Sequence, residues 1–270
     1  MIGHDLGMEL RGANVLVTGA TGGIGQALAK ALADRGGRVV LTGRRADVLE
    51  PLADRLGGRA IVADLADRAA AGKLLDEAGR VDVLVANAAL PASGLLDEYS
   101  IADVDRTLDV NLRAPIVMAK LAAAQMADRG RGHLVFVSSL SGKTASGQAS
   151  LYNATKFGMR GFALALREDL RAHGIGVSTI FPGFIRDAGM FADAGVTLPR
   201  GVGTRTPRDV ARATVRAVER NIAEIDVAPL GLRIGARIGG IAPVLAAAVQ
   251  RRAGGQRIAE DLADGQRGKR

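Results

Sequence analysis

Short apolar runs rich in valine, leucine and isoleucine alternate along the chain with longer stretches rich in alanine and leucine. Strands that alternate with helices in this way form a parallel sheet with helices on both faces. We therefore expect an α/β protein with a doubly wound parallel sheet in three layers. The predicted strands are 14–17, 38–42, 60–63, 81–85, 133–137, 177–180 and 225–227. The predicted helices are 26–35, 46–56, 67–78, 101–126 with a kink at Pro115, 150–173 and 207–221.

Two segments depart from this alternation. Residues 184–206 contain several glycines and a proline with little periodicity, which is typical of a functional lid or a disordered loop. Residues 230–270 form a basic, alanine-rich extension beyond a main domain expected over residues 1–229. Within it, 238–250 are apolar nearly all round, so a helix there should be buried over the protein's own cleft or against a second subunit. Docking on an anionic membrane is the minor alternative, and the chain from about Ala253 is expected to be disordered.

The amino-acid composition argues against several kinds of site and several classes of function. The 270 residues include no cysteine and three histidines that lie far apart, so neither disulfides nor a metal site is expected. Between Ala228 and Arg270, eight basic and three acidic residues supply +5 of the net charge of +8, which leaves the remainder nearly balanced. With 3% aromatic residues, nucleic-acid binding is disfavoured. Neither a signal-peptide pattern nor an apolar run of membrane length is found, so we expect a cytoplasmic protein.

A glycine-rich turn joins the first predicted strand to the first predicted helix. Backbone N–H groups in such a turn approach a pyrophosphate at the positive end of the helix. The Gly-x-Gly-x-x-Gly pattern is met only in part, because Leu28 stands where a third glycine is usual, and an ordinary strand-to-helix turn is the alternative. The placement predicts a Rossmann fold with cofactor contacts at Gly19, Thr21, Gly22, Gly23, Ile24 and Gly25.

Two arginines follow the second predicted strand, where an acidic residue would bind an unphosphorylated ribose. An acidic side chain repels a 2′-phosphate, whereas arginine pairs with it through two hydrogen bonds. Arg44 and Arg45 therefore favour NADP(H) over NAD(H), unless both belong to a solvated loop.

The candidate chemistry lies around Tyr152. Lys156 is one helical turn further on, so the two side chains share a face, and a nearby ammonium lowers the pKa of a phenol. Ser139 lies just after the strand predicted at 133–137 and could hold the same substrate oxygen. Ser138 is the alternative serine. Tyrosine and lysine at this spacing are also common on any amphipathic helix.

With these residues assembled, the sequence resembles the short, single-domain branch of the short-chain dehydrogenase/reductase family over about residues 13–226. Asn111, Ser139, Tyr152 and Lys156 match that family's catalytic tetrad in order. The resemblance implies that Tyr152 is the general acid in reduction and the base in oxidation, while Ser139 orients the carbonyl or hydroxyl. It also implies that Lys156 binds the nicotinamide ribose and lowers the Tyr152 pKa, and that Asn111 holds a water in a proton relay. The alternative interpretation of Asn111 is structural: its side chain satisfies backbone groups that the kink at Pro115 leaves without partners.

The resemblance implies further cofactor contacts at Asp64, Leu65, Asn87, Ala88, Pro182 and Gly183. Asp64 stands where the family's aspartate meets the adenine amino group; capping the next helix is its alternative role. Ala86 and Ala89 replace an asparagine and a glycine of the family's element after strand four, and Asp187 replaces a threonine near the carboxamide. Gly22 also fits the turn of the family's longer, sugar-nucleotide-modifying branch, although the short chain favours the shorter branch.

The expected function is NADP(H)-dependent interconversion of a hydrophobic ketone or aldehyde with an alcohol by hydride transfer. A non-catalytic NADP(H)-binding regulatory or scaffold module is the alternative. The helices that begin at Ile101 and Ser150 are expected to join subunits in a dimer or tetramer. The expected substrate pocket comprises Leu90, Ser141, Ala145, Phe184, Met190 and Phe191, with Arg186 and Lys143 as nearby cations.

Overall fold

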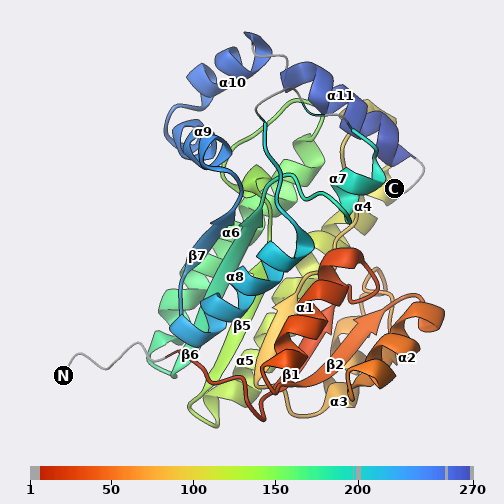
Figure 1. Ribbon diagram of the computed structural model, residues 1–270, viewed down its shortest axis with the longest axis vertical. Helices are drawn as coiled ribbons and strands as arrows, with labels where there is room; N and C mark the ends of the chain where they lie inside the picture. Colours follow the sequence, from red (N-terminus) through yellow and green to blue (C-terminus); the bar gives the residue numbers. More distant parts are fainter. Residues whose placement is uncertain (1–6, 197, 199–201, 253–254, 268–270) are drawn as a thin grey trace.

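The computed structural model describes residues 7–196, 198, 202–252 and 255–267. Over these residues, seven parallel strands form a sheet in the order β3-β2-β1-β4-β5-β6-β7, with helices on both faces (Figure 1). The strands are β1 (Asn14–Thr18), β2 (Arg38–Gly43), β3 (Arg59–Val62), β4 (Val83–Ala86), β5 (Gly132–Val137), β6 (Ile175–Pro182) and β7 (Glu224–Val227). The helices of the main body are α1 (Gly23–Asp34), α2 (Ala46–Arg55), α3 (Ala70–Ala78), α4 (Ile101–Leu108), α5 (Ala114–Ala127), α6 (Ser150–Arg171), α7 (Met190–Asp193) and α8 (Pro207–Arg220).

The sheet reverses its direction of growth at β1, which pairs with β2 on one side and with β4 on the other. In a doubly wound sheet the ligand cleft opens at this reversal, outside the carboxyl ends of the strands. The predicted Rossmann architecture is confirmed, and every predicted strand is present within about two residues of its expected limits.

Successive side chains of each central strand enter two different cores. Val15 and Val17 of β1 pack with α1, α2 and α8, whereas Leu16 packs on the opposite face with α3, α5 and α6. Because both faces are covered, the central strands carry apolar side chains on both sides and do not alternate between apolar and polar residues. This is why the sequence shows continuous apolar runs for them.

The helix predicted over 101–126 is interrupted. A π-helical turn, Asp109–Arg113, separates α4 from α5. Pro115 has no N–H to donate to the carbonyl of Asn111 four residues earlier, so the α-helical pattern cannot run through this point. The expected kink is therefore present as a wider turn immediately before the proline.

The C-terminal extension differs most from the prediction. It forms three helices, α9 (Leu230–Ile241), α10 (Pro243–Arg252) and α11 (Gly255–Gln266), which lie over the carboxyl ends of the strands (Figure 1). Pro243 begins α10, so 238–250 is not one helix. Ile238, Leu245 and Ala246 line the cavity described below, as packing over the protein's own cleft requires, whereas Ile241 and Val244 are 86% and 82% exposed in the single chain. Disorder beyond Ala253 is wrong over 255–266, whereas 253–254 and 268–270 lie outside the described residues. No helix within the described ranges has the length and apolar character needed to cross a membrane.

Candidate active site

A cavity of about 1390 Å³ lies at the carboxyl ends of β1, β4, β5 and β6. The loops that follow these strands form its floor, and α7 with the three C-terminal helices forms its roof. Every residue predicted to contact the cofactor lines it: Gly19, Thr21, Gly22, Gly23, Ile24, Gly25, Arg44, Arg45, Asp64, Leu65, Asn87, Ala88, Tyr152, Lys156, Pro182 and Gly183.

The glycine turn is built by close backbone packing. Gly19 has a φ of +65°, and a Cβ on it would lie 2.8 Å from the Ala88 Cα. A Cβ on Gly25 would lie 2.1 Å from the Gly19 carbonyl oxygen. Gly22 differs, since its nearest neighbour would be 3.6 Å away, and no side chain caps the first N–H groups of α1. The turn therefore leaves an open helix N-terminus, the arrangement that accepts a pyrophosphate.

Gly25→Ala is expected to lower the free energy of unfolding by about 1–3 kcal/mol, because the new methyl group overlaps the Gly19 carbonyl. Gly22→Ala is the matched control, and its free energy of unfolding should stay within about 0.5 kcal/mol of the wild type. Urea denaturation measures both values. Equal losses in the two variants would contradict this account of the turn.

Asn87 joins the ends of two neighbouring strands below the turn. Its backbone N–H donates to the Thr18 hydroxyl at 3.0 Å, and its side-chain amide donates to the Thr18 carbonyl at 3.0 Å and the Gly19 carbonyl at 3.3 Å. Asn87 therefore fastens the glycine turn to the end of β4, with Ala86 and Ala89 close to it in the sequence.

Three of the four predicted catalytic residues meet at the cavity wall. Ser139 follows the end of β5, and Tyr152 and Lys156 project from the first two turns of α6. Ser139 hydrogen-bonds the Tyr152 phenol. The Lys156 ammonium lies 5.4 Å from the phenol ring centroid and donates to the Val137 carbonyl at 3.4 Å. Ser138 instead donates to the Lys156 backbone carbonyl at 3.3 Å, which leaves Ser139 as the serine beside the phenol.

Burial determines the protonation of this pair. Burial raises the pKa of Tyr152 to about 12, outweighing the hydrogen bond from Ser139, which lowers it. Burial also lowers the pKa of Lys156 to about 8. The expectation that the ammonium lowers the Tyr152 pKa below its ordinary value is therefore wrong. At neutral pH Tyr152 is a phenol that holds its proton.

Asn111 lies on the π-helical turn, buried behind the cavity wall. Its Oδ1 accepts from the Leu90 N–H at 2.6 Å, and its Nδ2 donates to the Leu90 carbonyl at 2.9 Å. The side chain thus fixes the segment after β4 to the helix that carries the turn. Val110, and not Asn111, contributes to the cavity wall.

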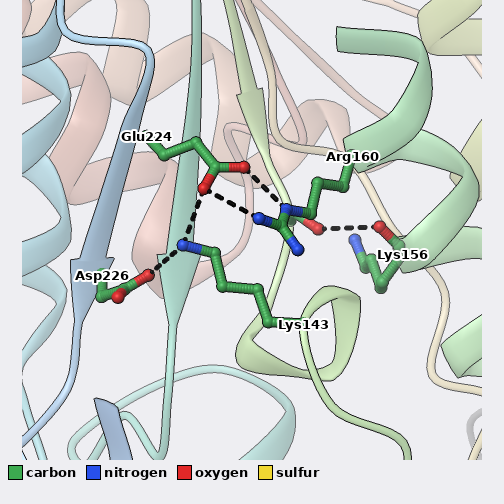
Figure 2. Close-up of polar contacts among 6 residues, drawn as sticks. Lys143, Lys156, Arg160, Glu224 and Asp226 are labelled. Carbon is green, nitrogen blue, oxygen red and sulfur yellow. Dashed lines mark hydrogen bonds and ion pairs between the residues drawn. The ribbon is translucent and has the colours of Figure 1, made fainter. Parts of the chain in front are cut away.

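Lys143 belongs to a buried ion-pair network between the segment after Ser139 and β7 (Figure 2). Its ammonium lies 2.6 Å from Asp226 and 3.0 Å from Glu224, and Arg160 of α6 pairs with Glu224 at 2.7 Å. The Lys143 ammonium also lies 4.1 Å from the Phe181 ring centroid. Lys143 therefore holds the segment that begins at Ser139 against β7, and it does not line the cavity as a cation for substrate.

The charged residues near the predicted cofactor contacts differ in their hydrogen-bond partners and in whether they line the cavity. Arg45 donates to the Thr21 carbonyl at 2.7 Å, which ties it to the glycine turn, while Arg44 is exposed at the cavity edge. Asp64 accepts from the Ala66 N–H at 3.1 Å and does not cap α3, so the alternative role considered for it is wrong. Asp187 has a left-handed φ of +73°, pairs with Arg186 at 3.6 Å and is absent from the cavity wall.

The substrate side of the cavity is larger than the sequence predicted. Leu90, Ser141, Phe184, Met190 and Phe191 line it as expected, whereas Ala145 does not and Thr144 does. The C-terminal helices add a second wall, which no local sequence motif signalled: Gly231, Leu232, Gly235, Ala236, Ile238, Leu245, Ala246, Gly255, Ile258, Ala259, Leu262 and Gln266.

Comparison with known proteins identifies the family of the chain. A family profile described as short chain dehydrogenase matches residues 13–197. The ketoacyl reductase HetN of a Nostoc species is 33% identical over 227 residues, covering 81% of this chain and 79% of that protein. Dehydrogenase/reductase SDR family member 7B of Xenopus laevis is 31% identical over 262 residues, covering 88% of this chain and 81% of that protein. A short-chain dehydrogenase from Sphingobium yanoikuyae, solved in complex with NADPH, matches with a TM-score of 0.75 at 28% identity, covering 86% of this chain and 94% of that one. The chain therefore belongs to the short-chain dehydrogenase/reductase family and is an oxidoreductase enzyme.

Proposed function

We propose that this enzyme reduces a hydrophobic ketone or aldehyde with NADPH, and oxidises the corresponding alcohol in the reverse direction. The observation that carries the proposal is that Ser139, Tyr152 and Lys156 line the same cavity as the glycine turn, with Ser139 hydrogen-bonded to the Tyr152 phenol. When bound, the nicotinamide cofactor supplies or accepts the hydride.

The residues of the chain supply positioning and the proton. Tyr152 holds its proton at neutral pH and donates it to the carbonyl oxygen in reduction, because that oxygen becomes basic as hydride arrives. Ser139 donates a hydrogen bond to the same oxygen and so orients it. Lys156, which lies beside the phenol, binds the nicotinamide ribose. Asn111 would hold a water in a proton relay to Lys156, while its side chain fixes the segment after β4 through Leu90.

The open N-terminus of α1 would hold the pyrophosphate, and Arg44 supports a preference for NADP(H) over NAD(H). Asp64 and Leu65 would face the adenine, and Pro182 and Gly183 the nicotinamide end. The relative solved with NADPH supports the choice of cofactor.

Arg44→Ser is expected to raise the KM for NADPH about 10–100-fold while changing the KM for NADH little. The reason is that a charge-assisted hydrogen bond to the 2′-phosphate contributes about 1.5–3 kcal/mol. Arg38→Ser is the control, since Arg38 is exposed at the opposite end of the same strand, β2. Steady-state kinetics with both cofactors measures the effect. If Arg44→Ser left the NADPH-to-NADH ratio of kcat/KM unchanged, Arg44 would have no part in cofactor choice.

The substrate class follows from the wall that the C-terminal helices provide. Side chains from α9, α10 and α11 at this wall are aliphatic apart from Gln266, and the same cavity is lined by Phe184 after β6 and by Met190 and Phe191 of α7. No cation stands among these residues to bind a carboxylate. The naming of a relative as a ketoacyl reductase agrees with a carbonyl substrate that carries an apolar chain.

A spectrophotometric screen of hydrophobic ketones, aldehydes and alcohols with NADPH and NADH tests the proposal. Turnover of apolar carbonyl compounds with NADPH is the expected result. Tight NADPH binding with no turnover across the panel would favour the alternative, a non-catalytic NADP(H)-binding module.

We further infer that the enzyme is a cytoplasmic homo-oligomer, a dimer or tetramer joined through α5 and α6. Leu121 of α5 and Phe157 and Leu164 of α6 keep more than a third of their surface exposed, which suits a helical subunit interface. Sedimentation analysis of the full chain measures the oligomeric state.

A further inference from the structure

Six large apolar side chains are exposed on α9 and in the first turn of α10. A spacing of three or four residues places the four on α9 along one side of that helix, and the other two are neighbours at the start of α10. We call this surface the α9–α10 face, and it comprises Leu230, Ile234, Ile238, Ile241, Val244 and Leu245. In Figure 1 the two helices stand at the end of the molecule beyond the carboxyl edge of the sheet, away from the main body. Exposed apolar patches of this kind mark interaction surfaces.

The charged residues of these two helices have a single sign. Between Leu230 and Arg252 the sequence contains four arginines and no acidic residue, and Glu260, Asp261 and Asp264 follow on α11. Arg237 of α9 and Arg251 of α10 are exposed on the same two helices. Helices that combine exposed apolar side chains with charges that are all basic are typical of segments that lie in the interface of an anionic bilayer.

From this combination we infer that the α9–α10 face docks on an anionic lipid surface. A second copy of the chain fits the face less well. A two-fold interface would place the face against the same face of the other copy. The arginines of both copies would then meet with no acidic residue of α9 or α10 to pair with them. A bilayer containing anionic lipids supplies both the apolar layer and the negative charge.

Docking places the cavity mouth at the bilayer. Ile238 and Leu245 belong to the α9–α10 face and also line the cavity. An apolar substrate dissolved in the lipid then enters the cavity without crossing water, a consequence that rests on the proposed function. The docking itself needs neither cofactor nor substrate.

Co-sedimentation of the full chain with vesicles tests the docking. At low salt the protein should bind vesicles of equal parts phosphatidylglycerol and phosphatidylcholine, and it should bind vesicles of phosphatidylcholine alone far more weakly. Raising the salt concentration should weaken the binding, because surface charges are screened.

Two pairs of variants separate the apolar and the charged contributions. Ile241→Ser with Val244→Ser should weaken binding at least tenfold; neither residue lines the cavity, so turnover of a soluble substrate should not change. Ile101→Ser with Val62→Ser is the control, since it removes an exposed isoleucine and an exposed valine from other elements. Arg237→Gln with Arg251→Gln should weaken binding to anionic vesicles about 30-fold, as expected for two cations at a bilayer surface.

The matched charge control is Arg131→Gln with Arg171→Gln, which removes two exposed arginines at the amino end of the sheet and should leave binding unchanged. Failure of the wild-type protein to bind anionic vesicles would overturn the proposal. So would equal binding by the face variants and their controls. A soluble dimer that Ile241→Ser with Val244→Ser dissociates, in a protein that binds no vesicles, would assign the face to a subunit contact instead. Because binding is measured without substrate, its failure is distinct from failure of the proposed reaction.

Discussion

Replacement of Tyr152 by phenylalanine is expected to lower kcat for carbonyl reduction by about 10²–10⁴-fold, with little change in NADPH binding. The phenol is the acidic group beside Ser139 in the cavity, and removing its oxygen leaves the substrate carbonyl without a proton donor. The loss should appear in kcat, because the ring that packs at the cavity wall is retained. Initial rates with an accepted ketone, together with fluorescence titration of NADPH, separate the two effects.

Tyr99→Phe is the matched control, since Tyr99 is the other tyrosine of the chain. Its hydroxyl donates to the Ser93 carbonyl at 2.9 Å, so the substitution costs a hydrogen bond worth about 1 kcal/mol of folding free energy. Its kcat should remain near the wild-type value. Unchanged turnover in Tyr152→Phe would remove the assignment of this tyrosine as the acid.

The sequence predicts the main body well because its signals are local. Continuous apolar runs mark strands that are buried on both faces, as Val15, Leu16 and Val17 show for β1. The glycine turn was also predictable, since Gly25 has room for no side chain beside the Gly19 carbonyl. These features depend on neighbours in sequence or on backbone geometry that a short motif encodes.

The environment of the predicted residues could not be deduced in the same way. The spacing of Tyr152 and Lys156 correctly placed them on one helical face, yet the pKa of the phenol depends on burial by distant segments. In the C-terminal extension, an apolar composition did not mean burial: Ile241 and Val244 remain exposed although their helices help to cover the cavity. Helix α11 was missed because its order depends on packing against α7, as the close approach of Gly265 to Ala194 indicates.

The network around Lys143 was missed for a related reason. Glu224 and Asp226 lie more than 80 positions further along the chain and meet Lys143 only because β7 completes the sheet next to β6. Hydrogen bonds from Arg160 and Lys143 outweigh the effect of burial and keep the pKa of Glu224 below its ordinary value. The same pattern of lysine and acids in sequence is equally compatible with three solvated side chains.

Lys143→Met is expected to lower the free energy of unfolding by about 3–5 kcal/mol, the range found when one member of a buried ion pair is removed. The Asp226 side chain is only 3% exposed, so its carboxylate would lose its cation without gaining water (Figure 2). Glu224 would keep Arg160, which makes Asp226 the main source of the loss. Urea denaturation measures the change, and kcat should fall with it because Ser139 lies on the segment that Lys143 anchors.

Two further variants decide whether an uncompensated charge is the cause. Lys143→Met combined with Asp226→Leu should recover most of the lost stability, because an apolar pair of similar volume replaces the ion pair and leaves no buried carboxylate unpaired. Lys30→Met removes the cation from the exposed pair with Asp34 and should change the free energy of unfolding by no more than about 0.5 kcal/mol. If Lys143→Met lowered the free energy of unfolding as little as Lys30→Met, the ion pair with Asp226 would not hold the segment from Ser139 to Lys143 in place. If the double variant were no more stable than Lys143→Met, the loss would come from packing around the lysine side chain and not from the charge left on β7.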